Sequence, residues 1–546
     1  MTSPPVLHHD LLSRAAYSEG AGIARAMPRA VAVPRTADDV VALVRWAADT
    51  GTALVPRGSG SGMAGGAVGD GVIVDLSRVR DIGPVDVATR SVVAGPGAIR
   101  DAVDEAARAR GLRLPVDPSS GAFCTVGGMA STNAAGAHTL RYGSMRPWVL
   151  ALDCVFADGS RALIRRGAAP PLHVPAVARF IEQCRTSMPA WHAMAAVHAG
   201  VRKESSGYAL SDFARSGELL DLLVGSEGTL AIFVGLEIAL APRPGATSSV
   251  LAEFPTLEAA VNGAMQARHA GASACELLDR TFLDVAVEGG AMSLAADVEA
   301  VLLAEVEGSD SADAGLHARA LRSAFLEAGA SAVQLAVDAS AERALWSFRH
   351  AASPILSRLD PGLKSMQFIE DGAVPPERMP DYVRGVRRAL ASAGVRGVIF
   401  GHAGDAHIHV NPLIDVRLPD WRERVSRLLG DVVALTATLG GTLSGEHGDG
   451  RLRTPLLSRV WPAEVLAQFA LVKRAFDPNG ILNPGVKIPI AGQEALAAIK
   501  YDPALPPIPA AARAALDRVE QERRYDASRL ELVAHGAPIA ERTRRA

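Results

Sequence analysis

The sequence predicts an α+β fold in two blocks, on three observations. Residues 31–75 alternate short apolar strands with an amphipathic helix, and a glycine-rich loop directly follows one strand. A second block, from Val250 onward, also alternates strands with helices but contains few glycines. Between the blocks lies a proline-rich joint, Ala241-Pro242-Arg243-Pro244, which marks a domain boundary.

The first block begins with a strand at 31–33, after which Thr36 is placed to cap a helix. Apolar residues at positions 40, 43, 44 and 47 have helical spacing, and Gly51 ends the helix. Strands follow at 53–56 and 72–75, with the glycine-rich loop between them. This order predicts a βαβ opening with a ligand-binding loop at a strand end.

The second block predicts an open α+β layer of the split-βαβ, ferredoxin-like kind, because its strands are separated by helices. After Ile488 the chain becomes rich in alanine and proline, and then in charged residues. That tail is either a packing arm or a partner-binding arm, and packing is the simpler interpretation. The predicted strands are 250–254, 274–278, 301–306 and 333–337, and the predicted helices are 257–269, 318–327 and 510–523.

Composition excludes several classes of protein. The net charge of -3 argues against a nucleic-acid binder. The four cysteines form no C-x-x-C pair, which argues against an iron–sulfur or cysteine-rich zinc site. The first residues lack a basic and an apolar signal region, and no apolar stretch reaches the ~18 residues of a membrane span. We therefore expect a cytoplasmic protein, with peripheral contact to a membrane left open.

Three stretches of small residues, 56–66, 118–136 and 225–230, are candidates for a ligand site. Glycines let a backbone approach a ligand closely, so that successive N–H groups converge on phosphate oxygens. A merely flexible loop is the alternative for any one of them. The first stretch is not a Walker loop, and it lacks the helix that follows a Rossmann fingerprint. Three such segments are better explained by one large, phosphate-bearing cofactor than by three independent loops.

The three stretches resemble the FAD-binding half of flavoproteins of the vanillyl-alcohol oxidase and p-cresol methylhydroxylase (PCMH) type. The resemblance implies a two-subdomain PCMH-type FAD-binding domain and a ferredoxin-like substrate (cap) domain, followed by a helical C-terminal segment. The first loop has neither histidine nor cysteine, so nothing indicates a covalent flavin link. The residues that the resemblance assigns to FAD are Pro56, Arg57, Gly58, Ser59, Gly60, Ser61, Gly62, Pro118, Ser119, Thr125, Gly127, Gly128, Ser131, Asn133, Glu227, Gly228, Thr229 and, in a closing segment, Asn483.

Four of the 14 histidines lie between residues 402 and 447. His402 and His409 flank a glycine-containing turn after an apolar strand, where they can face each other. With Glu446 they make a three-ligand site for a divalent metal that leaves positions open for substrate. Asp405 can orient a histidine ring from outside this set. A surface or capping role is the usual alternative for one histidine, but it explains the cluster poorly.

This spacing resembles the D-lactate, D-2-hydroxyglutarate and glycolate dehydrogenase branch of the same flavoproteins. The resemblance implies metal ligands at His402, His409 and Glu446, and a catalytic base at His447. The branch has glycine and asparagine where this chain has Ala406 and His407, so the role of His407 stays open among metal binding, substrate contact and packing. The residues that the resemblance assigns to the substrate are Arg349, Ser353, Lys364 and Asn411; without the branch, Arg349 and Lys364 can equally be a solvated helix face.

The expected activity is FAD-dependent, metal-assisted oxidation of a small D-2-hydroxy acid, such as D-lactate, by hydride transfer to flavin N5. D-2-hydroxyglutarate and glycolate are alternative substrates, and the expected metal is zinc, with manganese and iron open. The electron acceptor is a quinone, a cytochrome, an electron-transfer flavoprotein or an iron–sulfur partner, and a homodimer stays open. The rivals are an ether-lipid synthase, a non-catalytic flavin-binding subunit of an oxidase complex and a flavin-free metallohydrolase.

The predicted domain division places the cofactor and the substrate in different parts of the chain. An N-terminal arm covers 1–27, the FAD-binding domain 28–244 and the substrate domain 245–415. A segment at 416–490 returns to the flavin and metal, and the tail covers 491–546.

Overall fold

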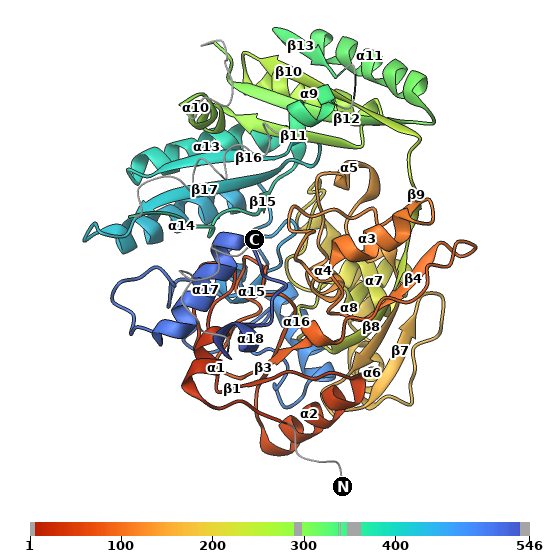
Figure 1. The fold of residues 1–546 in the computed structure, drawn as a ribbon, viewed down its shortest axis with the longest axis vertical. Helices are drawn as coiled ribbons and strands as arrows, with labels where there is room; N and C mark the ends of the chain where they lie inside the picture. Colours follow the sequence, from red (N-terminus) through yellow and green to blue (C-terminus); the bar gives the residue numbers. More distant parts are fainter. Residues whose placement is uncertain (1–5, 289–296, 337, 339, 347–361, 535–546) are drawn as a thin grey trace, which may run out of the picture.

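The computed structural model describes residues 6–288, 297–336, 338, 340–346 and 362–534. Two bodies are visible in Figure 1: an antiparallel sheet with helices at the top, and a larger body with three small sheets below it. We call residues 246–438 the cap and residues 6–244 the N-terminal body.

The N-terminal body begins with the predicted βαβ unit. Strand β3 (Val72–Asp75) pairs in parallel with β1 (Ala30–Ala32) on one side and β2 (Leu54–Arg57) on the other. Between β1 and β2 runs α2 (Ala37–Thr50), where Thr36 accepts a hydrogen bond from Asp39 N and Gly51 adopts φ 64°. The predicted N-cap and left-handed C-cap are therefore confirmed.

A four-stranded antiparallel sheet completes this body, in the order β4-β8-β6-β7. The strands are β4 (Ser91–Ala94), β6 (Val149–Val155), β7 (Arg161–Arg165) and β8 (Ile232–Ala239), with the short pair β5 (Leu112–Arg113) and β9 (Ala241–Pro242) beside them. The helices are α1 (Leu11–Ala16), α3 (Arg100–Arg108), α4 (Val126–Thr132), α5 (Thr139–Tyr142), α6 (Pro175–Cys184), α7 (Leu210–Ser216) and α8 (Leu219–Leu223).

The cap contains the predicted ferredoxin-like unit. Its first four strands, numbered along the chain, lie in the order 4-1-3-2, which is β13-β10-β12-β11, and the pairs are antiparallel. Strands β16, β17 and β14 extend the sheet beyond β11, and β15 pairs with β17. The strands are β10 (Ala246–Phe254), β11 (Ala274–Asp279), β12 (Ala300–Gly308), β13 (Ala332–Leu335), β14 (Leu363–Ser365), β15 (Gly372–Ala373), β16 (Arg396–His402) and β17 (His407–Asp415).

Both faces of the central strands of the cap sheet are buried. Successive residues of β10, such as Val250 and Leu251, belong to different hydrophobic clusters, because successive side chains of a strand point to opposite faces. One cluster includes α9 (Leu257–His269), α11 (Ser311–Glu327), α13 (Met379–Ser392) and α14 (Trp421–Thr438), and the other includes α10 (Arg280–Glu288). The helical layer of the cap thus continues through α14, past the predicted end of the substrate domain at 415.

Helix α11 begins seven residues before the predicted start at 318, because Asp310 caps it. The Asp310 side chain accepts hydrogen bonds from the N–H groups of Ala312 and Asp313. The first turns of the helix are polar and have little apolar periodicity. A prediction from apolar spacing alone therefore places the start of the helix too late.

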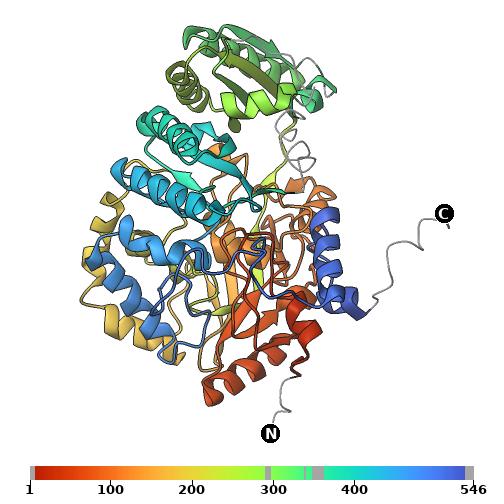
Figure 2. The same ribbon diagram turned by 90° about the vertical axis from the view of Figure 1, so that its left-hand side faces the viewer.

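The last described segments return to the N-terminal body. Helix α16 (Ala463–Phe476) packs there against α6, whereas α15 (Gly450–Arg453) lies at the boundary: Leu452 packs in the larger cap cluster, and its N–H donates to the carbonyl of Ala64. Helices α17 (Ala510–Glu522) and α18 (Arg529–Ala534) pack against α1, and in Figure 2 α17 runs alongside the red and orange N-terminal segments. The tail is therefore a packing arm over its described residues.

Two further findings concern membrane-spanning helices and the cysteines. No helix of the described residues is long and apolar enough to cross a bilayer. The four cysteines are free and buried, as expected for structural thiols.

Candidate active site between the cap and the N-terminal body

The hairpin β16–β17 carries three histidines. His402 ends β16, and its Cα partner on β17 is His407, whereas His409 lies opposite Phe400. His402 and His409 are nevertheless neighbours, with their Nε2 atoms 3.4 Å apart. The turn is a 3-10 segment, and Ala406 rather than either of its glycines adopts the left-handed conformation, at φ 52°.

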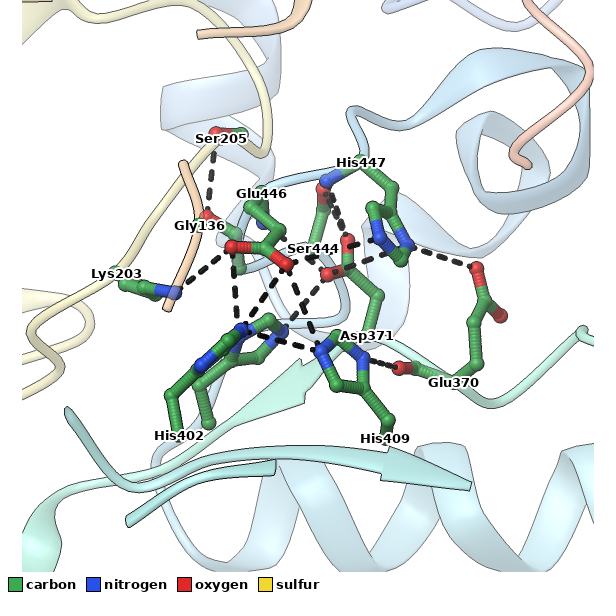
Figure 3. Close-up of polar contacts among 12 residues, drawn as sticks. Gly136, Lys203, Ser205, Glu370, Asp371, His402, His409, Ser444, Glu446 and His447 are labelled. Carbon is green, nitrogen blue, oxygen red and sulfur yellow. Dashed lines mark hydrogen bonds and ion pairs between the residues drawn. The ribbon is translucent and has the colours of Figure 1, made fainter. Parts of the chain in front are cut away.

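Glu446 reaches the three rings from the loop after α14 (Figure 3). Its Oε1 lies 3.4 Å from His402 Nε2 and 3.5 Å from His409 Nε2, and its Oε2 lies 3.9 Å from His407 Nδ1. The four buried residues offer ligand atoms that all lie within 4.8 Å of one another. The structure thus brings together the three predicted ligands and adds His407 to them.

In His402 and His409, the ring nitrogen that points away from Glu446 has a hydrogen-bond partner, and this partner determines the tautomer. His402 Nδ1 lies 2.5 Å from a carboxylate oxygen of Glu276, and His409 Nδ1 lies 2.8 Å from the carbonyl oxygen of Glu370. Both partners are acceptors, so each Nδ1 carries the hydrogen and each Nε2 presents a lone pair to Glu446.

The tautomer of His407 is fixed in the same way, but its Nε2 takes the part that Nδ1 has in the other two rings. Its Nε2 lies 2.8 Å from Asp371 Oδ1, so it carries the hydrogen, and the buried Nδ1 has no hydrogen-bond partner among the described residues. Three imidazole lone pairs and a carboxylate therefore converge on one point. Such a set repels itself unless a cation lies between its members, so the residues present fit a divalent metal.

The pKa shifts of this cluster differ from residue to residue. Burial disfavours the charged ring of His402, but Glu276 and Glu446 outweigh burial and raise its pKa, whereas burial lowers the pKa of His407. Burial lowers the pKa of His409 well below its usual value, helped by the neighbouring His407. The pKa of Glu446 is held well below its usual value despite burial, chiefly by Lys203 and His402. Neutral imidazoles and an ionised carboxylate are the forms that bind a metal.

His447 lies beside the cluster of three histidines and Glu446 rather than within it. Its Nδ1 is 3.3 Å from Glu370 Oε1 and 3.6 Å from Asp371 Oδ1, while its Nε2 is 3.8 Å from Glu446 Oε1. Burial opposes the charged ring, but Asp371, Glu370 and Glu446 outweigh it and raise the pKa of His447 to about 9.

Asp371 holds the loop that carries Glu446 and His447. Its carboxylate accepts hydrogen bonds from Ser444 Oγ and from the backbone N–H groups of Glu446 and His447. These contacts fix where both side chains point. Asp371 follows no motif in the sequence, so its role could not be predicted.

Lys203 is a further residue that sequence reasoning missed. It comes from the N-terminal body, is buried, and its Nζ lies 2.8 Å from Glu446 Oε2. The only signal in the sequence was a basic residue within a short polar stretch.

Asp405 was expected to orient a histidine, but this was wrong: it pairs with Arg268, and Glu276 orients His402.

A cavity of about 1100 Å³ adjoins this cluster and is lined by Glu446, His447, Lys364 and Asn411. It exceeds the usual range of small-ligand pockets, ~300–1,000 Å³. The three glycine-rich stretches converge on it, and the predicted FAD residues that line it are Pro56, Arg57, Gly58, Ser59, Gly60, Ser61, Gly62, Pro118, Ser119, Thr125, Gly127, Gly128, Ser131, Glu227 and Gly228.

Three residues assigned to FAD hold the loops together and do not line the cavity. Asn133 ends α4 at φ 52° and accepts a hydrogen bond from Arg146 N. The Thr229 hydroxyl bonds to Tyr208 and to a backbone carbonyl, and the Asn483 amide donates to the carbonyls of Gly66 and Glu227. Two of the predicted substrate residues, Arg349 and Ser353, lie outside the described residues.

Known proteins match nearly the whole chain. Residues 28–163 match a model described as an FAD binding domain, and residues 243–486 match the C-terminal domain of FAD linked oxidases. A D-lactate dehydrogenase of Archaeoglobus fulgidus is 30% identical over 461 residues, which cover 83% of this chain and 90% of the relative. The chain belongs to the FAD-linked oxidase family of the PCMH type.

Other relatives of this FAD-linked enzyme agree. The glycolate oxidase subunit GlcD of Escherichia coli K12 is 28% identical over 488 residues, covering 89% of this chain and 88% of the relative. A 4-ethylphenol oxidase from Gulosibacter chungangensis and an alkyldihydroxyacetonephosphate synthase share the fold, with TM-scores of 0.63 and 0.60. They cover 88% and 89% of this chain and 94% and 86% of their own, at 15% and 16% identity, so they show the fold alone.

Proposed function

We propose that this enzyme oxidises a small D-2-hydroxy acid to the 2-keto acid, with D-lactate as the model substrate and hydride transfer to flavin N5. The observation that carries the proposal is the convergence of three imidazole lone pairs on Glu446, at the edge of the cavity that the FAD loops line. Its relatives support the substrate class, because they are named glycolate oxidase, D-lactate dehydrogenase and D-2-hydroxyglutarate dehydrogenase.

The metal ligands in this proposal are His402, His409 and Glu446, with His407 as a fourth. The orphaned Nδ1 of His407 supports the fourth ligand, because a buried acceptor without a partner costs about 1–3 kcal/mol. Nitrogen and carboxylate ligands suit zinc, manganese or iron. A divalent cation held there supplies Lewis acidity to the 2-hydroxyl group.

The substrate carboxylate is bound by cations on the cavity wall. Lys364 lines the cavity and has no carboxylate partner among the described residues, so its ammonium is available to an anion. Asn411 lines the same wall from β17 and offers an amide to the substrate. Arg349 and Ser353 are proposed to complete this anchor.

His447 is proposed to accept the proton of the 2-hydroxyl group. Its Nδ1 faces two carboxylates, which favours hydrogen on Nδ1 and leaves the Nε2 lone pair on the side of Glu446. A cation on Glu446 offsets one of the carboxylates that raise the pKa of His447, and this favours the neutral ring that a base requires.

Anaerobic bleaching of the flavin tests the proposal. D-lactate, glycolate and D-2-hydroxyglutarate should be compared with L-lactate and with a simple alcohol. At least one D-acid or glycolate should bleach the flavin, whereas the alcohol should not, because it lacks the carboxylate. Flavin that no acid of the panel reduces would instead support a non-catalytic flavin-binding subunit.

Lys364→Gln tests the carboxylate anchor separately. An ionic hydrogen bond contributes about 1.5–3 kcal/mol, so kcat/KM for the acid should fall about tenfold or more. Arg427→Gln is the control, because Arg427 is a cation of the cap that is exposed, pairs with Glu423 and does not line the cavity. Equal kcat/KM in the Lys364 variant and the wild type would contradict the assignment.

A further inference from the structure

The tail beyond the matched family models forms part of the cofactor cavity. We call residues 499–529 the C-terminal arm; the family match ends at residue 486. Eight residues of the arm line the same cavity as the glycine-rich loops: Lys500, Tyr501, Arg513, Asp517, Glu520, Gln521, Arg523 and Tyr525. We propose that the arm completes the FAD site, with Arg523 binding the pyrophosphate and Tyr525 with Phe123 forming an aromatic wall.

The arm touches the first and the second of the three glycine-rich loops. Arg529, which is buried, donates a hydrogen bond from Nη2 to the carbonyl oxygen of Ser59, at 3.2 Å in the first loop. The ring of Tyr525 lies 5.2 Å from that of Phe123 in the second loop, and the Arg523 guanidinium lies 5.2 Å from the same ring. The arm thus bridges two segments that are far apart in the sequence.

The loops themselves provide no free positive charge. The one cation of the first loop, Arg57, is buried, and its guanidinium donates to the backbone carbonyls of Tyr17, Glu19 and Ala67 at 3.0–3.4 Å. The other cavity-lining residues of the loops carry no positive charge; their polar side chains are hydroxyls, the thiol of Cys124 and the carboxylate of Glu227. A dinucleotide pyrophosphate carries two negative charges, and a cation from elsewhere favours its binding.

The other ionic side chains of the arm are already paired. Arg513 binds Glu19 and Asp517, with Nη2 2.9 Å from a Glu19 carboxylate oxygen. Lys500 lies 3.5 Å from Glu520, which also accepts from Tyr501 Oη. Among the cavity-lining cations, only Lys364 and Arg523 have neither a carboxylate nor a carbonyl partner in the described part of the chain. Lys364 serves the substrate in our proposal, which leaves Arg523 for the cofactor.

Arg523 has a left-handed backbone conformation, and in this conformation its side chain lies at the cavity. Arg523 is the C-cap of α17 and adopts φ 52°, a conformation that glycine usually fills at this position. A side chain in the left-handed region costs about 1–2 kcal/mol, and strain of this kind persists at sites where geometry matters. The conformation brings the guanidinium over Phe123 and to the cavity.

Release of FAD from the holoenzyme on dilution, followed by flavin fluorescence, tests this proposal. Arg523→Gln should raise the Kd for FAD about tenfold, because it removes a charged hydrogen-bond donor. Arg523→Lys should keep most of the affinity, and Tyr525→Leu should weaken it. Arg524→Gln is the matched control, since Arg524 is adjacent, pairs with Asp526 and does not line the cavity.

ADP as a competitor separates the phosphates from the flavin ring. It carries the pyrophosphate without the isoalloxazine, so Arg523→Gln should weaken ADP competition by the same factor as FAD binding. Raised salt should weaken FAD binding more in the wild type than in Arg523→Gln. Kd values for FAD and ADP that agree within twofold among Arg523→Gln, Arg524→Gln and the wild type would overturn the proposal, whatever substrate the enzyme oxidises.

Discussion

In each of the three clustered histidines, His402, His407 and His409, the acceptor on the outer nitrogen determines which nitrogen faces Glu446. Glu276, the Glu370 carbonyl and Asp371 each bind one ring, and the opposite nitrogen of that ring then faces Glu446. These acceptors lie far from the histidines in sequence, so the motif predicts which residues gather but not which nitrogen of each ring is free.

Two substitutions separate metal binding from proton transfer. Glu446→Gln should lose the metal, because it removes the anionic ligand and keeps the shape of the side chain. His447→Asn should keep metal and flavin but reduce the rate of flavin reduction by ~10²–10⁴-fold, the usual contribution of a general base. Metal analysis and anaerobic stopped-flow on both purified variants check these outcomes. Stoichiometric metal in Glu446→Gln, or near-normal reduction in His447→Asn, would show that the roles are wrong.

The backbone conformation of Ala406 leads us to predict that a glycine at this position stabilises the protein. Its φ of 52° lies in the left-handed region, and glycine adopts this conformation without a steric cost. Ala406→Gly should raise the free energy of unfolding by about 1 kcal/mol, measured by urea denaturation. Ala403→Gly, in the same turn but with a right-handed backbone, should lower it. A loss of stability in Ala406→Gly would mean that the methyl group packs better than the strain costs.

At the scale of elements, one strand of the cap holds the two bodies together. His138, at the start of α5, lies 2.5 Å from Asp117 and 2.9 Å from Glu305 on β12. Two residues along β12, Glu307 accepts hydrogen bonds from Tyr142 and Arg113. The carboxylates of one cap strand thus bind cations and a hydroxyl of the N-terminal body.

The pKa of His138 gives this contact a pH dependence. Burial opposes its charge, but Asp117 and Glu305 raise the pKa from 6.5 to about 10. A raised pKa means that the stabilisation is complete below about pH 6.5 and is lost as the pH rises towards 10. His138→Gln should therefore cost about 2 kcal/mol in urea unfolding at pH 6, and less at pH 9.

The control for this prediction is His269→Gln, at the exposed end of α9. Its unfolding free energy should follow that of the wild type at both pH values. A cost of His138→Gln that does not change between pH 6 and pH 9 would contradict the charged form of His138.

Sequence patterns predict the helices and strands whose own residues determine where they begin and end. The bounds of α9 and β3 agree with the prediction to the residue; Thr256 caps α9, and β3 is a short, buried, mostly apolar run. The same patterns place the three loops and the histidine hairpin. They do not reveal Lys203 or Asp371, since each reaches the site from a segment without periodicity or motif. Packing of the two bodies brings Lys203 to Glu446, and folding of the cap itself brings Asp371 to His407.

Across the whole molecule, the site draws on distant parts of the chain. The histidines belong to the cap, Glu446 follows the last cap helix, and Lys203 belongs to the N-terminal body. A cation bound there connects these parts and should stabilise the folded state. At a free concentration of 100 Kd the gain is about 2.7 kcal/mol.

Removal of the metal should therefore lower the Tm as well as the activity. Treatment with a chelator should lower the Tm of the wild type, and zinc or manganese should restore it. Glu446→Gln should show the same Tm with and without chelator, as measured by scanning calorimetry. A wild-type Tm that chelation leaves unchanged would place the cation outside the folded core.

The contact between Lys203 and Glu446 joins residues 243 positions apart in the chain. Contacts of such long sequence separation form slowly, because a large loop must close before they contribute. During refolding, local helices and the cap sheet should form first, and the metal ligands should meet only when the two bodies dock. Recovery of flavin reduction should then lag behind recovery of helical circular dichroism, and catalytic competence becomes a readout of the last step of assembly.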